Sequence, residues 1–182
     1  MSTLSNMEAV LLGLLTEKPM HPYEIEKNVV DRDMRGWTEI SMSSIYKVLG
    51  KLEKKLLVDV KIEQATTGIQ RKVYTITDRG RMEVKEKVQE LVSEIPVIIY
   101  PVELGLHNLH LLSGAESEEA LSSYIRSIDR QLDCFTGLET YLKNDTSCPF
   151  YRIALAIRRQ YILRAEREWA RSFLSEVKNA HH

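Results

Sequence analysis

Residues 41–76 of this 182-residue chain have the sequence SMSSIYKVLGKLEKKLLVDVKIEQATTGIQRKVYTI, and this stretch decides the fold. Ser41 can cap a helix whose apolar residues recur at three- and four-residue spacing on one face: Ile45, Val48, Leu49, Leu52 and Leu56. Residues 58–63 then alternate apolar and polar side chains, residues 64–68 are typical of a turn, and residues 70–76 indicate a returning strand. A helix followed directly by a hairpin predicts the winged form of the helix-turn-helix.

The opposite face of the same helix carries cations and small residues: Ser43, Lys47, Gly50, Lys51 and Lys54. Residues 41–81 contain nine lysines and arginines against four acidic residues, a local excess of five positive charges, although the whole chain has a net charge of -1. A basic patch on a near-neutral protein favours sequence-selective binding of nucleic acid, because charge over the whole surface promotes non-specific binding. The alternative is an ordinary solvated helix face.

Three further helices complete the predicted N-terminal domain. A capping box at Ser5–Glu8 precedes an apolar run at residues 9–15, which indicates a buried first helix. Pro22 suits the first position of a second helix that ends near residue 30, and Thr77 can cap a fourth that ends near residue 95. Prolines at 96 and 101 mark a boundary, so we expect domains at residues 1–95 and 96–180.

The second half predicts helices alone. We expect a short helix near residues 102–112, a loop at residues 113–117, and a final helix near residues 150–178. Between them an apolar stripe, interrupted by Glu139, indicates an antiparallel helix pair or a dimer seam. The fold class is therefore mainly α with a small β-hairpin wing, followed by an all-helical dimerisation domain. The expected dimer contacts are Leu121, Ile125, Ile128, Leu132, Ile157, Tyr161, Trp169 and Phe173. The aromatic residues among them could instead line an effector pocket.

Four stretches carry a family resemblance: AVLLGLL at 9–15, HPYEI at 21–25, SIYKVLGKLE at 44–53 and RKVYTITDRG at 71–80. In this order and spacing they resemble the PadR family of transcriptional regulators, and the second half is similar to the longer subfamily with a helical dimerisation domain. The resemblance implies a homodimeric repressor that binds double-stranded DNA at an inverted repeat. A small-molecule effector is a further possible partner.

Three positions depart from the family pattern. Pro22 stands where the family usually has glycine, and Lys47 replaces a proline that follows the tyrosine of the third helix. Lys55 stands where we expect the glycine that opens the wing, so the sequence does not determine the last residue of the third helix.

The expected DNA-binding residues are Tyr23, Ser43, Ser44, Tyr46, Lys47, Lys51, Thr67, Gly68, Arg71 and Lys72. Serines and lysines of a helix in the major groove can contact base edges and phosphates, and the tyrosines can hydrogen-bond phosphates. Core packing is the alternative for Tyr46. Arg71 and Lys72 point to opposite faces of a strand, so we expect one to reach DNA and the other to be an ordinary surface charge.

Other functions have little support in the sequence. Cys134 and Cys148 are expected to be ordinary thiols, and His107 and His110, although spaced for a metal, are expected to be partly buried histidines. We find no phosphate loop and no nucleophile–base set, and we expect no enzyme activity, no cofactor, no membrane association and a cytoplasmic location. The rival hypotheses are a winged-helix adaptor for proteins, and a ligand-sequestering helical protein or minor enzyme.

Overall fold

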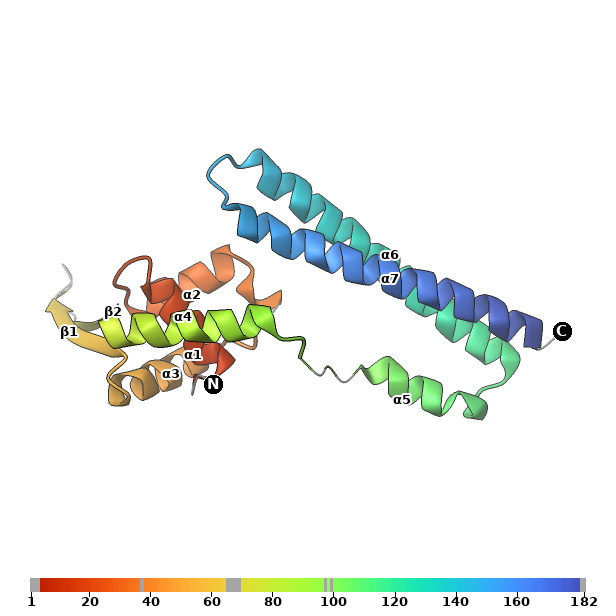
Figure 1. Cartoon of the computed structure of the whole chain (residues 1–182), viewed down its shortest axis with the longest axis horizontal. Coiled ribbons are helices and arrows are strands. Elements are labelled where there is room, and N and C mark those ends of the chain that lie inside the picture. Colours follow the sequence, from red (N-terminus) through yellow and green to blue (C-terminus); the bar gives the residue numbers. More distant parts are fainter. Residues whose placement is uncertain (1–3, 37, 65–69, 97, 99, 181–182) are drawn as a thin grey trace. The chain divides into compact units, whose positions relative to one another are not determined.

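The computed structural model describes residues 4–36, 38–64, 70–96, 98 and 100–180, and the chain divides into two compact units at residues 1–97 and 98–182 (Figure 1). The first unit has the order α1 (Asn6–Leu15), α2 (Pro22–Asp31), η1 (Met34–Gly36), α3 (Met42–Lys54), β1 (Val58–Gln64), β2 (Gln70–Ile76) and α4 (Asp78–Ser93). The second has α5 (Pro101–His107), η2 (Leu109–Leu111), α6 (Gly114–Asn144) and α7 (Phe150–Ala180). The predicted fold class is confirmed.

The predicted helix caps are present. In α1 the N–H of Glu8 donates to Ser5 Oγ at 3.2 Å, and the N–H of Ser5 donates to Glu8 Oε2 at 2.8 Å. Ser41 caps α3 through the same reciprocal pair of bonds, and at α4 the side chain of Thr77 accepts from the N–H of Gly80. The cap of α2 was not predicted: the N–H of Glu24 donates to Nδ1 of His21 at 3.2 Å, so a ring nitrogen caps the start of this helix.

The core of the first unit is closed by its own helices. Side chains with no exposed surface come from α1, α2, α3 and the start of the hairpin: Leu11, Leu12, Ile25, Ile45, Leu49, Leu52 and Leu57. Leu56, which we expected on the same apolar face, is 69% exposed, and that expectation was wrong. Its φ of 59° turns the chain out of α3, so the side chain points away from the core.

The residue that opens the wing is Leu56, and not Lys55 as we expected. Lys55 has a right-handed backbone (φ -80°), and Leu56 is the residue in the left-handed region that favours glycine. Lys55 instead reaches back to α1, where its Nζ lies 2.7 Å from Oε1 of the buried Glu8. The end of α3 is therefore tied to the cap of α1.

The hairpin joins the helices at its base. β1 and β2 are antiparallel, with Val58 opposite Ile76, and Gln64, which we expected in the turn, is the last residue of β1. The connector between α1 and α2 adds a bridge, because Met20 and Tyr74 exchange backbone hydrogen bonds at 3.1 and 2.9 Å. Gly80 of α4 lies so close to this base that a Cβ atom would stand 2.3 Å from the carbonyl oxygen of Leu57.

In the second unit α6 and α7 lie side by side and antiparallel over most of their lengths (Figure 1). The expected loop at residues 113–117 was wrong, because Ser113 and Glu116 form a capping box and α6 begins at Gly114. Six apolar side chains are buried among the described residues of this unit: Leu121, Ile128, Leu132, Ala156, Ala170 and Val177. Within the described residues we find no helix whose apolar stretch would carry it across a bilayer.

Gln160 of α7 is a polar residue inside this helix pair, with only 3% of its surface exposed. Its Nε2 donates to the carbonyl of Phe135 at 3.3 Å and to Oε2 of Glu139 at 2.5 Å. Its Oε1 accepts from Thr136 at 3.4 Å and from Arg164 at 2.9 Å. All four hydrogen-bonding positions of the amide are thus used, which explains why Glu139 can interrupt the apolar stripe.

Candidate nucleic-acid interface

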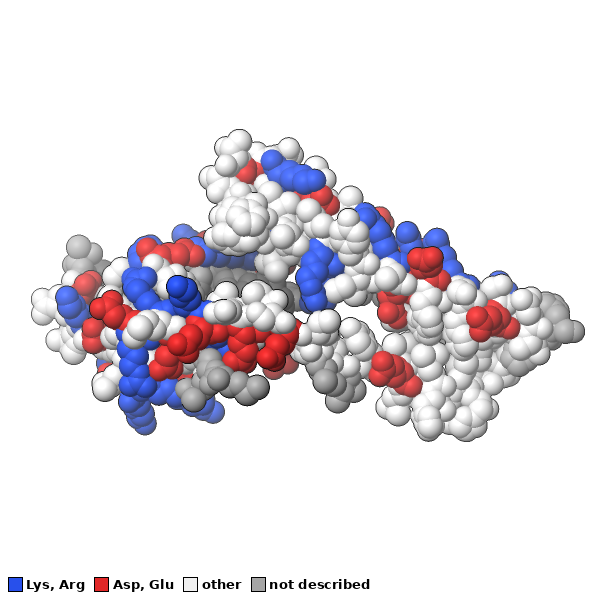
Figure 2. Space-filling model, in the orientation of Figure 1, with Lys and Arg blue, Asp and Glu red and all other residues white. Residues whose placement is uncertain are grey.

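The outer surface of α3 presents lysines that are available to a partner. Lys47, Lys51 and Lys54 are exposed, and none of them has a carboxylate within ion-pair distance in the described part of the chain. In the first unit, Figure 2 shows basic side chains at the edge formed by α3 and acidic ones along α4. The positive charge therefore gathers on the helix that the sequence assigns to the DNA.

Other cations of the same segment are already paired. Lys55 binds Glu8, Arg79 lies 3.0 Å from Glu83, and Lys72 Nζ lies 3.8 Å from Glu53 of α3. The nine cations of residues 41–81 are thus not one uniform patch. The unpaired lysines of α3 lie together on one face of that helix, and the paired residues hold the surrounding elements in place.

The pairing distinguishes the two cations of β2. Lys72 faces α3 through Glu53, whereas Arg71 is exposed and has no ion pair among the described residues. Arg71 is therefore the residue of the two that is free to reach a phosphate. Thr67 and Gly68, expected at the wing tip, lie outside the described residues.

The two serines at the start of α3, Ser43 and Ser44, differ in their contacts. The hydroxyl of Ser44 donates to the carbonyl of Ser41 at 2.7 Å and accepts from the N–H of Ser41 at 2.8 Å. Ser43 is exposed, and its hydroxyl lies 3.0 Å from that of Ser41. Ser44 mainly caps the helix, so Ser43 is the stronger candidate for a DNA contact.

Two exposed tyrosines come together from α2 and α3. Tyr23 is 67% exposed and Tyr46 is 48% exposed, so Tyr46 lies at the rim and not in the core. Partial burial raises the pKa of Tyr46, and the charge and hydrogen bond of the Tyr23 hydroxyl raise it further. The Tyr46 phenol therefore stays protonated at neutral pH and can donate to a phosphate oxygen. The sequence named both residues, but their contact depends on the packing of α2 against α3.

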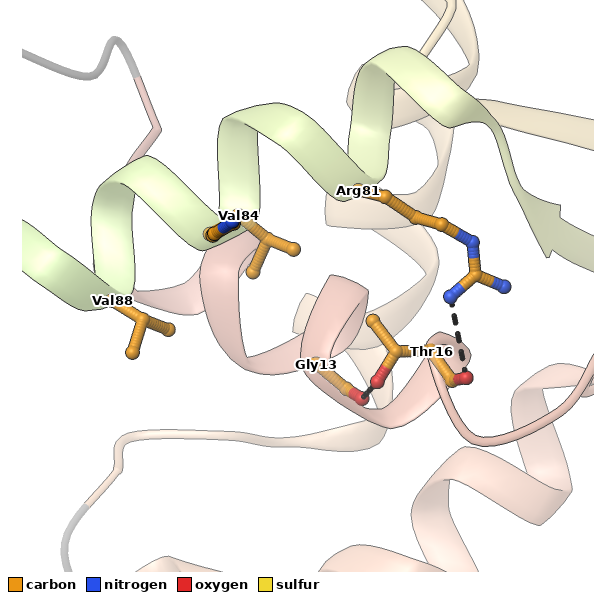
Figure 3. A pocket seen from close by; sticks show the side chains of 6 residues that line it. Gly13, Thr16, Arg81, Val84 and Val88 are labelled. Atoms are coloured by element: carbon orange, nitrogen blue, oxygen red, sulfur yellow. Dashed lines mark hydrogen bonds between the residues drawn. The ribbon is translucent and has the colours of Figure 1, made fainter.

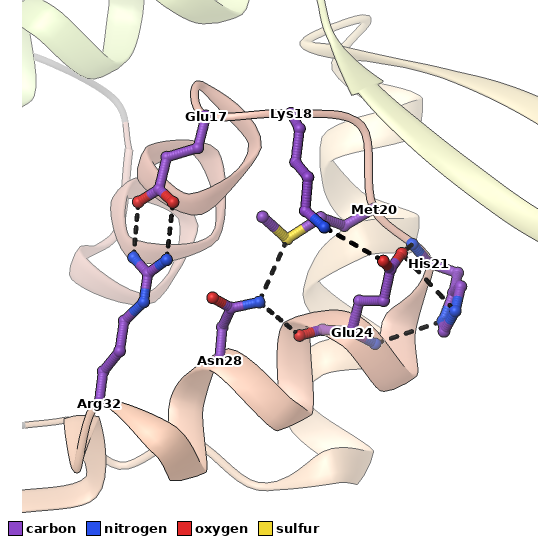
Figure 4. Close-up of polar contacts among 7 residues, drawn as sticks. All are labelled: Glu17, Lys18, Met20, His21, Glu24, Asn28 and Arg32. Carbon is purple, nitrogen blue, oxygen red and sulfur yellow. Dashed lines mark hydrogen bonds and ion pairs between the residues drawn. The ribbon is translucent and has the colours of Figure 1, made fainter.

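Polar contacts fix the turn that leads into α2 (Figure 4). Arg32 binds both carboxylate oxygens of Glu17, at 2.5 and 2.7 Å, and so ties the end of α2 to the end of α1. Asn28 donates to the carbonyl of Glu24 at 2.8 Å. These bonds set the angle between the first two helices, and with it the position of Tyr23.

A hollow of about 390 Å³ lies between α1 and α4, on a different surface from the row of lysines. Its lining combines apolar and cationic side chains: Gly13, Thr16, Arg81, Val84, Lys85 and Val88. In Figure 3 Arg81 reaches toward the end of α1, where its guanidinium lies 3.5 Å from the carbonyl of Thr16. This hollow belongs to the first unit, whereas the aromatic residues expected near an effector belong to the second.

The expected dimer contacts fall into three groups. Leu121, Ile128 and Leu132 are buried between α6 and α7 of one chain, so they stabilise the antiparallel pair. Tyr161 and Trp169 are exposed on α7, and the Trp169 ring stacks on Phe173 with centroids 5.8 Å apart. Ile125, Ile157 and Phe173 are half-buried.

Residues considered for other chemistry have ordinary environments. His107 and His110 are exposed, so the expectation that they are partly buried was wrong. No cluster of three histidine, cysteine or acidic side chains that could hold a metal occurs among the residues described. Cys134 and Cys148 are free thiols.

Tyr124 of α6 donates to Glu166 of α7 at 2.9 Å. Burial, followed by this bond, raises the pKa of Tyr124 to about 12.

Two helices, α2 and α3, joined by a connector that contains η1, with lysines on the second helix and a hairpin directly after it, form a winged helix-turn-helix. Residues 11–86 match the model of the Transcriptional regulator PadR-like family. We refer to residues 11–86 as the PadR-like domain, after the model that they match. A relative from Lysinibacillus sphaericus, described as uncharacterized, is 29% identical over 85 residues, which cover 47% of this chain and 77% of the relative.

Solved structures show that the fold extends beyond the PadR-like domain. Bacillus subtilis PadR in complex with operator DNA has a TM-score of 0.77 and 19% identity, over 95% of this chain and 99% of that one. The same protein in complex with p-coumaric acid has a TM-score of 0.76 and 20% identity, over 94% and 98%. The Vibrio cholerae virulence activator AphA has a TM-score of 0.71 and 16% identity, over 96% and 99%.

Proposed function

We propose that this chain is a DNA-binding transcriptional regulator that binds an inverted-repeat operator as a homodimer and acts as a repressor. The observation that carries the proposal is the row of unpaired lysines on the exposed face of α3, within a PadR-like domain. The complex of Bacillus subtilis PadR with operator DNA supports the same use of this fold. The proposal includes no enzyme activity and places the protein in the cytoplasm, together with its DNA.

The proposed mechanism is geometric. Each subunit lays α3 in a major groove, where Ser43 and Lys47 face base edges and Lys51 faces a phosphate. Tyr23 and Tyr46 donate to phosphates at one side of the helix, and Arg71 does so from the wing. Two such heads at a fixed separation require two half-sites, which accounts for an inverted repeat.

The homodimer is proposed to form through the exposed apolar surface of the second unit. Tyr161, Trp169 and the ring of Phe173 that stacks on it provide aromatic area of the kind enriched in protein interfaces. A small-molecule effector would act by favouring a dimer in which the two heads no longer match the operator. The p-coumaric acid complex of Bacillus subtilis PadR is the precedent for an effector in this fold.

The double variant Lys47→Ala, Lys51→Ala tests the proposal. Each lysine that neutralises a phosphate adds about one unit to the slope of log affinity against log salt. Lys51 is proposed to do so in each of the two subunits, so the slope should fall by about two. The affinity for a duplex from the chain's own upstream region should fall at least tenfold. Fluorescence anisotropy at several salt concentrations measures both quantities.

The matched control removes two cations from α6, as Arg126→Ala, Lys143→Ala. Both side chains are paired with carboxylates in the structure, and neither lies in the PadR-like domain. This control should bind DNA like the parent. Equal affinity and equal salt slope for the α3 variant and the parent would favour the rival hypothesis of an adaptor that binds proteins.

A further inference from the structure

Gly50, which is half-buried, lies in the middle of the face of α3 that carries the exposed lysines. It follows Lys47 by three residues and precedes Lys54 by four, so both lysines flank it on the helix surface. Ser43 lies two turns before it on the same face. The centre of the proposed interface therefore has no side chain, while cations stand on both sides of it.

Nothing within the described chain requires glycine at this position. A Cβ atom built on Gly50 meets no other atom within 4 Å, so alanine would fit without displacing a neighbour. The backbone there is helical and does not occupy the left-handed region in which glycine is favoured. Glycine inside a helix nevertheless destabilises it relative to alanine. The folded subunit thus loses stability at Gly50 and gains no packing from it.

We infer that Gly50 is a positioning residue of the DNA interface, whose missing side chain lets the backbone of α3 approach the floor of the major groove. This inference rests on the proposed function. The flanking cations argue for DNA as the approaching molecule, because a groove floor lies between two rows of phosphates. Lysines at the sides and an open centre match that arrangement.

The depth of α3 affects some contacts more than others. Short side chains such as Ser43 reach base edges only when the helix lies deep in the groove. Lys51 and Lys54 have long side chains and can reach phosphates from a shallower position. A side chain at residue 50 should therefore weaken binding to a selected sequence more than binding to unrelated DNA.

The test uses the full chain with Gly50→Ala and Gly50→Leu. The probes are a duplex that the parent selects from a random-sequence library and an unrelated duplex of equal length. Alanine should lower the affinity for the selected duplex at least tenfold, and leucine should lower it further. Binding to the unrelated duplex should change less than threefold. The unfolding midpoint of Gly50→Ala should rise by a few degrees, because helix propensity improves.

Gly13→Ala in α1 is the matched control. Gly13 is also helical and also meets no atom within 4 Å, so its substitution should raise the unfolding midpoint by a similar amount and leave DNA binding unchanged. If Gly50→Ala bound the selected duplex within twofold of the parent, the inference would be wrong while the proposed function stood. If the parent selected no duplex at all, the proposed function would fail and the inference with it.

Discussion

The two units of this chain bury their apolar side chains in different ways. Residues 4–84 hold a single cluster of twenty buried apolar residues, contributed by every helix of the first unit and both strands. The described part of the second unit has 62 residues in α6 and α7 but buries six apolar side chains, two of which are alanines. Phe150, at the start of α7, is 82% exposed.

The first unit buries a large core within one chain, and the small core of the second unit supports the proposal that a partner covers it. A subunit whose apolar surface is covered only in an oligomer has a stability that depends on protein concentration. The first unit should thus keep its structure when the proposed dimer dissociates, whereas α6 and α7 should lose stability.

The largest expected effect lies in the closely packed first unit. In Gly80→Ala a Cβ atom would overlap the carbonyl oxygen of Leu57, so α4 must move away from the hairpin. Overpacking of this kind costs roughly 1–3 kcal/mol, and we expect a loss near 3 kcal/mol because the overlap is with backbone. Urea unfolding followed by far-UV circular dichroism measures it. An unchanged midpoint would show that α4 is not held at this distance.

Dilution should separate the two units. Hydrogen exchange of the full chain at high and low protein concentration should show at least tenfold faster exchange in α6 and α7 on dilution. Tenfold corresponds to about 1.4 kcal/mol of opening free energy. Exchange in α1 and α3 should not change. The variant Tyr161→Ser, Trp169→Ser should show the faster rates at both concentrations, and equal protection throughout would contradict the proposed dimer surface.

The Glu8–Lys55 pair should make the first unit sensitive to acid. Burial alone raises the pKa of Glu8, but hydrogen bonds from Lys55 and Ser5 outweigh it and hold that pKa below its ordinary value. A carboxyl with a depressed folded pKa adds stability above its unfolded pKa, and that contribution is lost as pH falls through the folded pKa. Glu8→Gln should therefore lose about 1–2 kcal/mol at pH 7, and this loss should shrink as the pH falls through the folded pKa.

Two further variants check this assignment. Lys55→Met keeps the length of the side chain and removes its charge, so it should destabilise the unit at pH 7 and reduce the acid sensitivity. Lys54→Met changes the neighbouring unpaired lysine and should do neither. Parallel pH profiles for Glu8→Gln and the parent would show that Glu8 does not contribute through its charge.

The smallest effect should come from Leu56→Gly. Relief of the left-handed backbone at φ 59° stabilises the folded state, and the greater freedom of glycine in the unfolded chain partly offsets this gain. We expect a net gain of about 0.5 kcal/mol, measured as a rise in the thermal midpoint. Lys55→Gly, at a right-handed position, should destabilise instead.

Much of the first unit could be predicted because its signals are local. The cap at Ser41, the apolar spacing of α3 and the alternation in β1 each depend on neighbouring residues, and all three are present. Leu56 was misplaced because it continues the three- and four-residue spacing of the apolar residues, whereas the backbone turns left-handed there. Which lysines are paired could not be predicted, since Glu8 and Lys55 are 47 residues apart.

In the second unit the apolar stripe predicted the helices but not their partners. Spacing alone does not distinguish a seam within one chain from a seam between two, so Leu121 and Tyr161 were grouped together although only the first is buried. The role of Gln160 was also missed, because the four groups that hydrogen-bond to its amide come from both α6 and α7. Such a residue looks like any surface glutamine until the helix pair forms.

The backbone bridge between Met20 and Tyr74 has a consequence for the kinetics of recognition. Because two hydrogen bonds attach the hairpin to the connector before α2, the base of the wing cannot swing independently of α2 and α3. In the proposed regulator, α3 and the base of the wing would then meet a duplex as one preformed body, and little conformational freedom would remain to be lost there on contact. Association should accordingly proceed without a slower phase in which the base of the wing folds onto DNA.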